Sequence, residues 1–234
     1  MIYVIVGPTG VGKTKLSIML AKKLNGIILN ADSMQVYKEM NIGTAKIKEE
    51  EKEGVPHYLF DIRSVNEEFN AFDYQQEGRR LLEKYKDKNI IIVGGTGLYI
   101  KVLLYDYSFG EEKNKDKKLY DFKMIGLTRN RDNLYSIINQ RVDEMINDGL
   151  IEEAKELYDK NIRTRAVMTA IGYKELYNYF DKEISLEEAI NKIKQNSRNY
   201  AKRQYTFFNN QFDNINWFNI EEQTFQQILE IVIK

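Results

Sequence analysis

The chain has 234 residues, of which 43% are hydrophobic and 30% are charged, and its 35 basic residues balance its 35 acidic ones. This composition is typical of one folded domain, or a domain with a small helical annex, and it excludes collagen-like, disordered and membrane-spanning classes. The absence of cysteine excludes disulfide scaffolds and thiolate metal sites, and the single histidine, His57, excludes a multi-histidine metal site. The net charge of zero excludes a globally basic nucleic-acid-binding protein, although it does not exclude a local basic groove.

Short β-branched runs in the first half predict strands of a parallel sheet, because segments with helical spacing separate them. The runs are Ile2–Val6, Ile27–Asn30 and Ile90–Val93, with residues 122–127 as a fourth candidate. The first run has no basic leader and breaks at Gly7, so we interpret it as a buried strand and not as a signal peptide or membrane span. We therefore expect a cytoplasmic protein.

The second half of the chain changes to helical periodicity. Asp132 is a candidate N-cap for a helix whose apolar residues recur at three- and four-residue steps, and Gly149 stands where a C-terminal glycine belongs. Further helices are predicted at about 150–160, 165–180, 186–208 and 221–233. We interpret the charged run 46–53 as an exposed helix face and the lysine-rich run 113–118 as a solvated loop. The expected fold class is α/β, a single domain over residues 1–234 with a mostly helical C-terminal half.

The segment after the first strand matches the phosphate-binding loop G-x-x-x-x-G-K-[ST] at every fixed position. Its residues are Gly7, Pro8, Thr9, Gly10, Val11, Gly12, Lys13 and Thr14. Such a loop wraps a phosphate or diphosphate in backbone N–H groups, and the helix that follows adds its positive end. Lys13 can place a charge on the phosphate oxygens, and the Thr14 hydroxyl can help to hold Mg²⁺. The sequence thus predicts a P-loop NTPase-like sheet flanked by helices.

The strands beyond the loop argue against simple nucleotide hydrolysis. The third strand runs into Gly94-Gly95-Thr96-Gly97 and lacks the acidic magnesium ligand that a hydrolase needs at that place. The second strand runs into Asp32, and because ligands of a parallel sheet lie beyond the carboxyl ends of its strands, Asp32 is expected beside the phosphate loop. The alternative is a helix N-cap formed by Asp32 or Ser33.

Seven motifs occur in an order typical of one family. They are the phosphate loop, Asp-Ser-Met-Gln-Val-Tyr at 32–37, Asn-Ile-Gly-Thr-Ala-Lys at 41–46, Pro-His at 56–57, Gly-Gly-Thr-Gly-Leu-Tyr at 94–99, Ala-Ile-Gly-Tyr-Lys-Glu at 170–175 and Tyr-Ala-Lys-Arg-Gln at 200–204. With them the chain closely resembles the tRNA dimethylallyltransferases, also called tRNA isopentenyltransferases. The resemblance covers residues 1–107 and 121–218.

The family transfers a dimethylallyl group from dimethylallyl diphosphate to N6 of the adenosine just 3′ of the anticodon, in tRNAs that read codons beginning with U. The resemblance implies that the phosphate loop holds the diphosphate and that Asp32 is the base that takes a proton from N6. Loop amides, Lys13, a Mg²⁺ near Thr14 and Arg203 would stabilise the departing diphosphate. Thr96 would contact the reacting centre through its hydroxyl.

The resemblance also implies contacts with the anticodon stem-loop of the tRNA. The residues expected to contact it at the reacting base are Asp32, Ser33, Met34, Gln35 and Thr96, with Gln35 and Met34 holding the flipped-out base by amide hydrogen bonding and apolar contact. Arg198 and Lys202 are four residues apart and share a helix face, so they predict phosphate contacts, the alternative being an ordinary solvated helix. Residues 163–174 hold a second basic stretch, and His57 is expected to hydrogen-bond to a turn.

This sequence departs from the family in two places. Typical bacterial members carry a helical insertion that helps to clamp the anticodon stem-loop, whereas here residues 100–121 form the whole interval and the insertion is reduced to about 106–121. The family's Thr-Trp-Phe-Arg is Thr-Phe-Phe-Asn at 206–209. Three alternatives stay open: an adenylate isopentenyltransferase acting on free AMP, a small-molecule kinase and a non-catalytic RNA-binding remnant. We expect a monomer.

Overall fold

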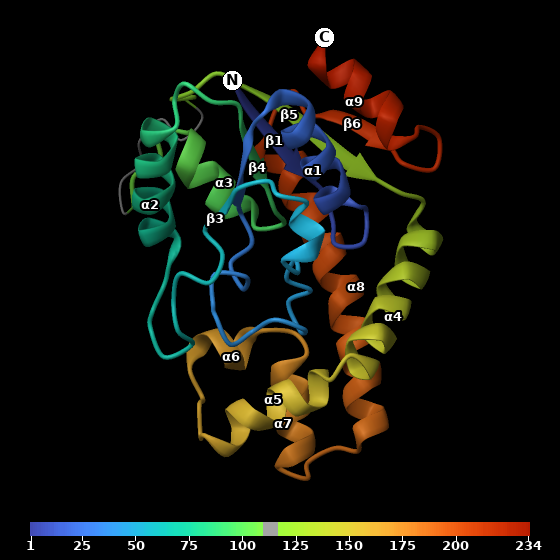
Figure 1. Cartoon of the computed structure of the whole chain (residues 1–234). Helices are drawn as coiled ribbons and strands as arrows, with labels where there is room; N and C mark the ends of the chain where they lie inside the picture. Colours follow the sequence, from blue (N-terminus) through green and yellow to red (C-terminus); the bar gives the residue numbers. More distant parts are fainter. Residues whose placement is uncertain (110–116) are drawn as a thin grey trace.

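The computed structural model describes residues 1–109 and 117–234, which form an α/β fold (Figure 1). Within these residues the six strands make one parallel sheet in the order β3-β2-β4-β1-β5-β6. The strands are β1 (Ile2–Val6), β2 (Ile27–Asn30), β3 (His57–Tyr58), β4 (Ile90–Val93), β5 (Phe122–Thr128) and β6 (Asn216–Asn219). The four predicted strands are confirmed. The edge strands β3 and β6 are not predicted, because β3 has only two residues and β6, Asn-Trp-Phe-Asn, lacks the β-branched run that marks the other strands.

Helices connect the strands and build the second half. They are α1 (Lys13–Leu24), α2 (Ala71–Lys84), α3 (Gly97–Leu104), α4 (Arg131–Asn147), α5 (Leu150–Asp159), α6 (Arg165–Thr169), α7 (Tyr173–Phe180), α8 (Leu186–Gln211) and α9 (Phe225–Ile233), with the 3-10 turn η1 (Glu50–Lys52). The α/β class with a mostly helical second half is therefore confirmed. In the described residues no helix is long and apolar enough to cross a membrane.

Several local predictions need correction. The predicted helix 165–180 is two helices, because the chain leaves helical geometry at Ala170 and Gly172 has a positive φ of 101°. The predicted helix face at 46–53 contains only the turn η1. Asn130, not Asp132, caps α4, since its side chain accepts the N–H of Asp132. Most of the predicted loop 113–118 lies outside the described residues.

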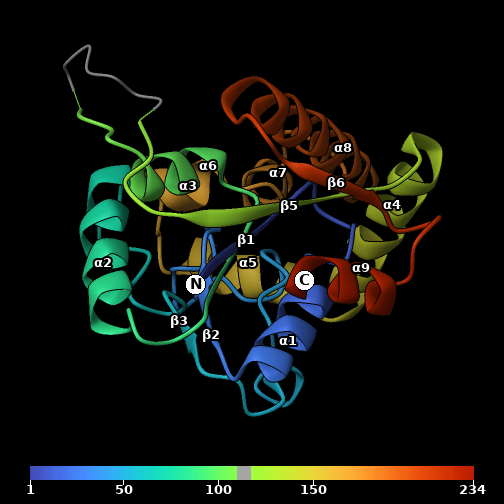
Figure 2. The ribbon, with the colours of Figure 1, turned by 90° about the horizontal axis from the view of Figure 1, so that it is seen from above.

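Two apolar layers cover the sheet, because successive side chains of a strand point to opposite faces. Val4 and Val6 of β1 pack with α2, α3 and the end of α8, whereas Tyr3 and Ile5 pack with α1, α9 and the start of α4. Figure 2 shows α1 and α9 on one side of the sheet and α3 and α8 on the other. These layers fix the positions of the strand ends.

A third apolar cluster lies beyond the carboxyl ends of the strands (Figure 1). It joins helices α4 to α8 to Val36, Tyr37 and Met40 of the segment that follows β2. Because α8 is 26 residues long, it runs through this helical cluster and up to the sheet. The segment after β2 is thereby held between the sheet and the helices.

Candidate active site

The end of the phosphate-binding loop, where α1 begins, leaves N–H groups available for an anion. Gly12 has φ +82°, a left-handed conformation that favours glycine, and α1 begins at the next residue without a side-chain cap. The free N–H groups of the first helical turn and the positive end of the helix dipole therefore point out of α1 at the loop. Across the loop, the Thr9 N–H donates to Oε1 of Gln204 on α8, at 3.0 Å.

Two cations converge on the same loop. The Lys13 Nζ donates to the carbonyl oxygens of Gly7 and Pro8 at 2.9 and 2.8 Å. Burial, opposed by Asp32 and assisted by the nearby Arg141, lowers the pKa of Lys13 to about 8. Arg141, on α4, donates to the Thr9 hydroxyl at 3.1 Å, and burial lowers the pKa of its guanidinium as well. The loop is thus built to receive a polyanion.

Arg141 has no counterpart among the predicted site residues. Its sequence signal is one basic residue inside an amphipathic helix, where an exposed arginine is commonplace. The contact with the loop depends on how α4 packs against the sheet, and it joins residues 132 positions apart.

Asp32 is held by a local turn at the end of β2. Its N–H donates to Asn30 Oδ1 at 2.9 Å, and its carboxylate accepts the N–H of Met34 at 3.0 Å and that of Gln35. No helix of the described residues begins here, so the helix N-cap alternative is wrong, although the carboxylate does accept backbone N–H groups. Burial raises the pKa of the Asp32 carboxyl, and Lys13 partly offsets that rise.

Asp32 and the phosphate loop follow strands that are not neighbours in the sheet, although the sequence suggests that the two lie side by side. β4 lies between β2 and β1, so the turn after β4 separates Asp32 from the loop after β1. That turn is bonded to the Asp32 segment, because the Thr96 hydroxyl accepts the Ser33 N–H at 3.0 Å and lies 3.2 Å from the Ser33 hydroxyl. The Tyr200 phenol hydrogen-bonds to Thr96 and Gln204, and burial raises its pKa.

Most of these groups line one cavity of about 950 Å³ between the carboxyl ends of the strands and the helical cluster, but Thr96 is not among its lining residues. Its walls include Lys13, Asp32, Gln35, Arg141 and Arg203. His57 also lines it, and the predicted bond to a turn is confirmed, since its Nδ1 lies 2.7 Å from the Val55 carbonyl. A buried carboxylate and several cationic side chains therefore share one cavity.

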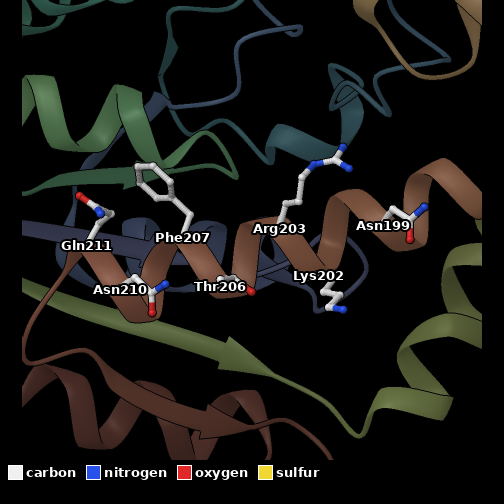
Figure 3. Close-up of a pocket in the computed structure, with 7 residues that line it drawn as sticks. All are labelled: Asn199, Lys202, Arg203, Thr206, Phe207, Asn210 and Gln211. Atoms are coloured by element: carbon white, nitrogen blue, oxygen red, sulfur yellow. The ribbon is translucent and has the colours of Figure 1, made fainter.

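A shallower groove of about 500 Å³ runs along α8 (Figure 3). It is lined by Asn199, Lys202, Arg203, Thr206, Phe207, Asn210 and Gln211. Arg203 lines both the groove and the cavity, so it is the residue that the two have in common. Arg198 is not in the groove, because its guanidinium donates to Asn139 of α4 at 2.6 Å. The structure therefore separates the predicted pair Arg198 and Lys202.

Comparisons with known proteins identify the family of this chain. A family model described as IPP transferase matches residues 35–119 and 107–211. The tRNA dimethylallyltransferase of Anoxybacillus flavithermus is 42% identical, over 95% of this chain and 91% of that protein. The chain belongs to the IPP transferase family. The tRNA dimethylallyltransferase of Geobacillus thermodenitrificans is also 42% identical, over 94% of this chain and 91% of that protein.

Solved members of the family share the fold. The tRNA isopentenylpyrophosphate transferase of Bacillus halodurans is 39% identical, with a TM-score of 0.92 over 99% of this chain and 94% of that chain. The enzyme of Staphylococcus epidermidis is 36% identical, with a TM-score of 0.91 over 99% of this chain and 97% of that chain. The alignment with the Anoxybacillus protein spans 285 positions, more than the whole of this chain, so that relative contains residues with no counterpart here.

Proposed function

We propose that this chain transfers a dimethylallyl group from dimethylallyl diphosphate to N6 of the adenosine just 3′ of the anticodon, in tRNAs that read codons beginning with U. The observation that carries the proposal is the placement of Asp32 and the Lys13 loop in one cavity, close enough for each to shift the pKa of the other. The relatives named tRNA dimethylallyltransferase support tRNA as the acceptor, and no feature of the cavity favours AMP, a kinase acceptor or binding alone.

The reaction divides between the two sides of the cavity. The N6 nitrogen forms a bond to the allylic carbon, the carbon–oxygen bond breaks, and its electron pair leaves with the diphosphate. Asp32 receives the N6 proton, and its raised pKa suits a base better than an ordinary carboxylate would. Lys13, Arg141, Arg203 and the loop N–H groups stabilise the charge on the departing diphosphate. Thr96 holds the Asp32 segment in place through Ser33.

The donor atoms at the loop suit a magnesium ion. The Thr14 side chain lines the cavity beside the loop and offers a hydroxyl oxygen, and Mg²⁺ prefers oxygen donors and shares them with phosphates and water. We propose that Thr14 holds Mg²⁺ with the diphosphate, where the ion would neutralise phosphate charge. In the described residues no cluster of three acidic or histidine side chains forms a separate metal site.

We propose that the RNA strand next to the reacting base follows the groove along α8. Lys202 and Arg203 supply positive charge, Phe207 supplies a ring on which a base can stack, and the remaining side chains are polar amides and a hydroxyl. We further propose a cytoplasmic monomer with a single domain, in which the family insertion is reduced to about 106–121. The two segments of the family match overlap at residues 107–119, and this supports the position of the reduced insertion.

The decisive experiment is transfer from labelled dimethylallyl diphosphate, with Mg²⁺, to unmodified tRNA, to the anticodon stem-loop and to AMP. We expect label in both RNAs and none in AMP. Label in AMP alone would establish the adenylate enzyme instead, and no label in any acceptor would reject prenyl transfer. For the groove, Lys202→Gln should weaken stem-loop binding and lower its salt slope by about one. Lys192→Gln, whose lysine pairs with Glu188 on the same helix, is the matched control.

A further inference from the structure

The last residue of β2, Asn30, holds the backbone of Asp32 with its side-chain amide. Asn30 is 1% exposed, and its Oδ1 accepts the Asp32 N–H at 2.9 Å while its Nδ2 donates to the Asp32 carbonyl at 3.0 Å. Because Nδ2 carries two hydrogens, it also donates to the Leu59 carbonyl at 3.0 Å. One buried amide therefore binds both polar backbone groups of Asp32 and ties them to the segment that follows β3.

These three partners allow the Asn30 amide only one orientation. A carbonyl oxygen only accepts hydrogen bonds, and a backbone N–H only donates them. Turned over, the amide would set its oxygen against the carbonyls of Asp32 and Leu59 and its NH₂ group against the Asp32 N–H. All three bonds would then be lost among buried groups, which is unfavourable. The contact with Asp32 is therefore specific to the asparagine amide in this orientation.

Asn30 is itself fixed in the core of the sheet. Its backbone pairs with Val93 of β4, and its carbonyl accepts the Tyr74 hydroxyl at 2.9 Å. Tyr74 is fully buried, and its ring stacks on that of Tyr99 in α3 with centroids 4.0 Å apart. The Asn30 amide therefore links Asp32 to a part of the molecule that is packed on every side.

A second bond of the same kind begins at Asp32. Its carboxylate accepts the N–H of Met34 two residues further on, just as Asn30 Oδ1 accepts the N–H of Asp32. Such bonds form Asx-turns, and two of them follow one another from residue 30 to residue 34. The first turn fixes the backbone of Asp32, and the second engages its carboxylate. The direction of the carboxylate consequently depends on the first turn.

We propose that Asn30 is a positioning residue for the transfer reaction, its amide holding the backbone of Asp32 so that the carboxylate is directed at the N6 proton. The proposal rests on the proposed function, in which Asp32 is the base. Proton transfer depends steeply on the position of the base, so loss of the amide should slow transfer about tenfold to a hundredfold. Diphosphate binding should be spared, because β4 separates β2 from the strand that leads into the phosphate loop.

Two pairs of variants separate the hydrogen bond from the volume of the side chain. Asn30→Ser and Asn30→Ala leave nearly the same void, but only serine offers an oxygen to the Asp32 N–H, since hydroxyl groups form the same turn more weakly. Asn30→Thr and Asn30→Val have equal shape and suit a strand, so they provide the comparison if the alanine variant does not fold. The rate is measured in single turnovers of labelled dimethylallyl diphosphate with unmodified tRNA, which report the chemical step.

We expect the serine and threonine variants to transfer the label at least about tenfold faster than the alanine and valine variants, respectively. The affinity of all four for inorganic diphosphate, measured by calorimetry, should stay within about twofold of that of the unaltered protein. A side chain that only supports the fold would instead affect both members of a pair alike. Equal rates within a pair whose members both fold would overturn the proposal.

A matched asparagine controls for a general loss of stability. Asn89 is half-buried at the opposite end of the sheet, directly before β4, and its Nδ2 donates to the Leu24 carbonyl at 2.9 Å. Asn89→Ala should lower the Tm and leave the single-turnover rate unchanged. A loss of rate equal to that of Asn30→Ala would overturn the proposal. Absence of transfer by the unaltered protein would reject the proposed function itself.

Discussion

The lowered pKa of Lys13 predicts that diphosphate binding takes up protons. Burial holds this pKa at about 8 in the free protein, so at pH 8 about half of the molecules carry a neutral lysine. A diphosphate in the loop brings negative charge next to the ammonium and raises its pKa. Binding of inorganic diphosphate should therefore take up about half a proton per site at pH 8 and about a tenth at pH 7.

Isothermal titration calorimetry in two buffers of different ionisation enthalpy, such as Tris and HEPES, measures this uptake directly. Lys13→Arg is the reference protein, because its guanidinium stays protonated at both pH values. The proton changes of the diphosphate itself are the same for the two proteins, so they cancel in the comparison. The difference between the two proteins should grow from pH 7 to pH 8. An equal uptake in both proteins at pH 8 would refute the reasoning.

Three further variants test the site. Asp32→Asn should lower transfer at least about a hundredfold. Its Tm should not fall, because burial raises the pKa of this carboxyl, and ionising it in the folded protein therefore opposes folding at pH values above its unfolded pKa. A large drop in Tm in melting curves would contradict this. A Cβ on Gly95 would lie 1.9 Å from Nε2 of Gln204, so Gly95→Ala should loosen the phosphate loop. Its cost in unfolding free energy should exceed that of Gly54→Ala by about 1–3 kcal/mol, because at Gly54 only the positive φ matters. Equal costs in denaturant unfolding would refute the contact. Arg141→Gln should weaken diphosphate binding about tenfold or more, and unchanged affinity in the calorimeter would remove it from the site.

The sequence predicts those features that depend on neighbours in the chain. The phosphate loop is one continuous motif, its glycines and lysine stand in fixed order, and strand and helix follow from local periodicity. The position of Asp32 in the cavity is predictable because it lies two residues beyond the end of β2. The family resemblance rests on the same kind of local signal, and the fold and the family are confirmed.

The tertiary structure decides which distant residues complete the site. Arg141 and Gln204 contact Thr9 across 132 and 195 positions. Glu153 accepts the backbone N–H groups of residues 41–43 from a helix more than a hundred residues away. Arg198 looks like a partner of Lys202 in the helix, yet it turns to Asn139. Periodicity shows that a helix has an apolar face, but which neighbour that face meets follows from packing around the sheet and the helical cluster, and that packing sets these contacts.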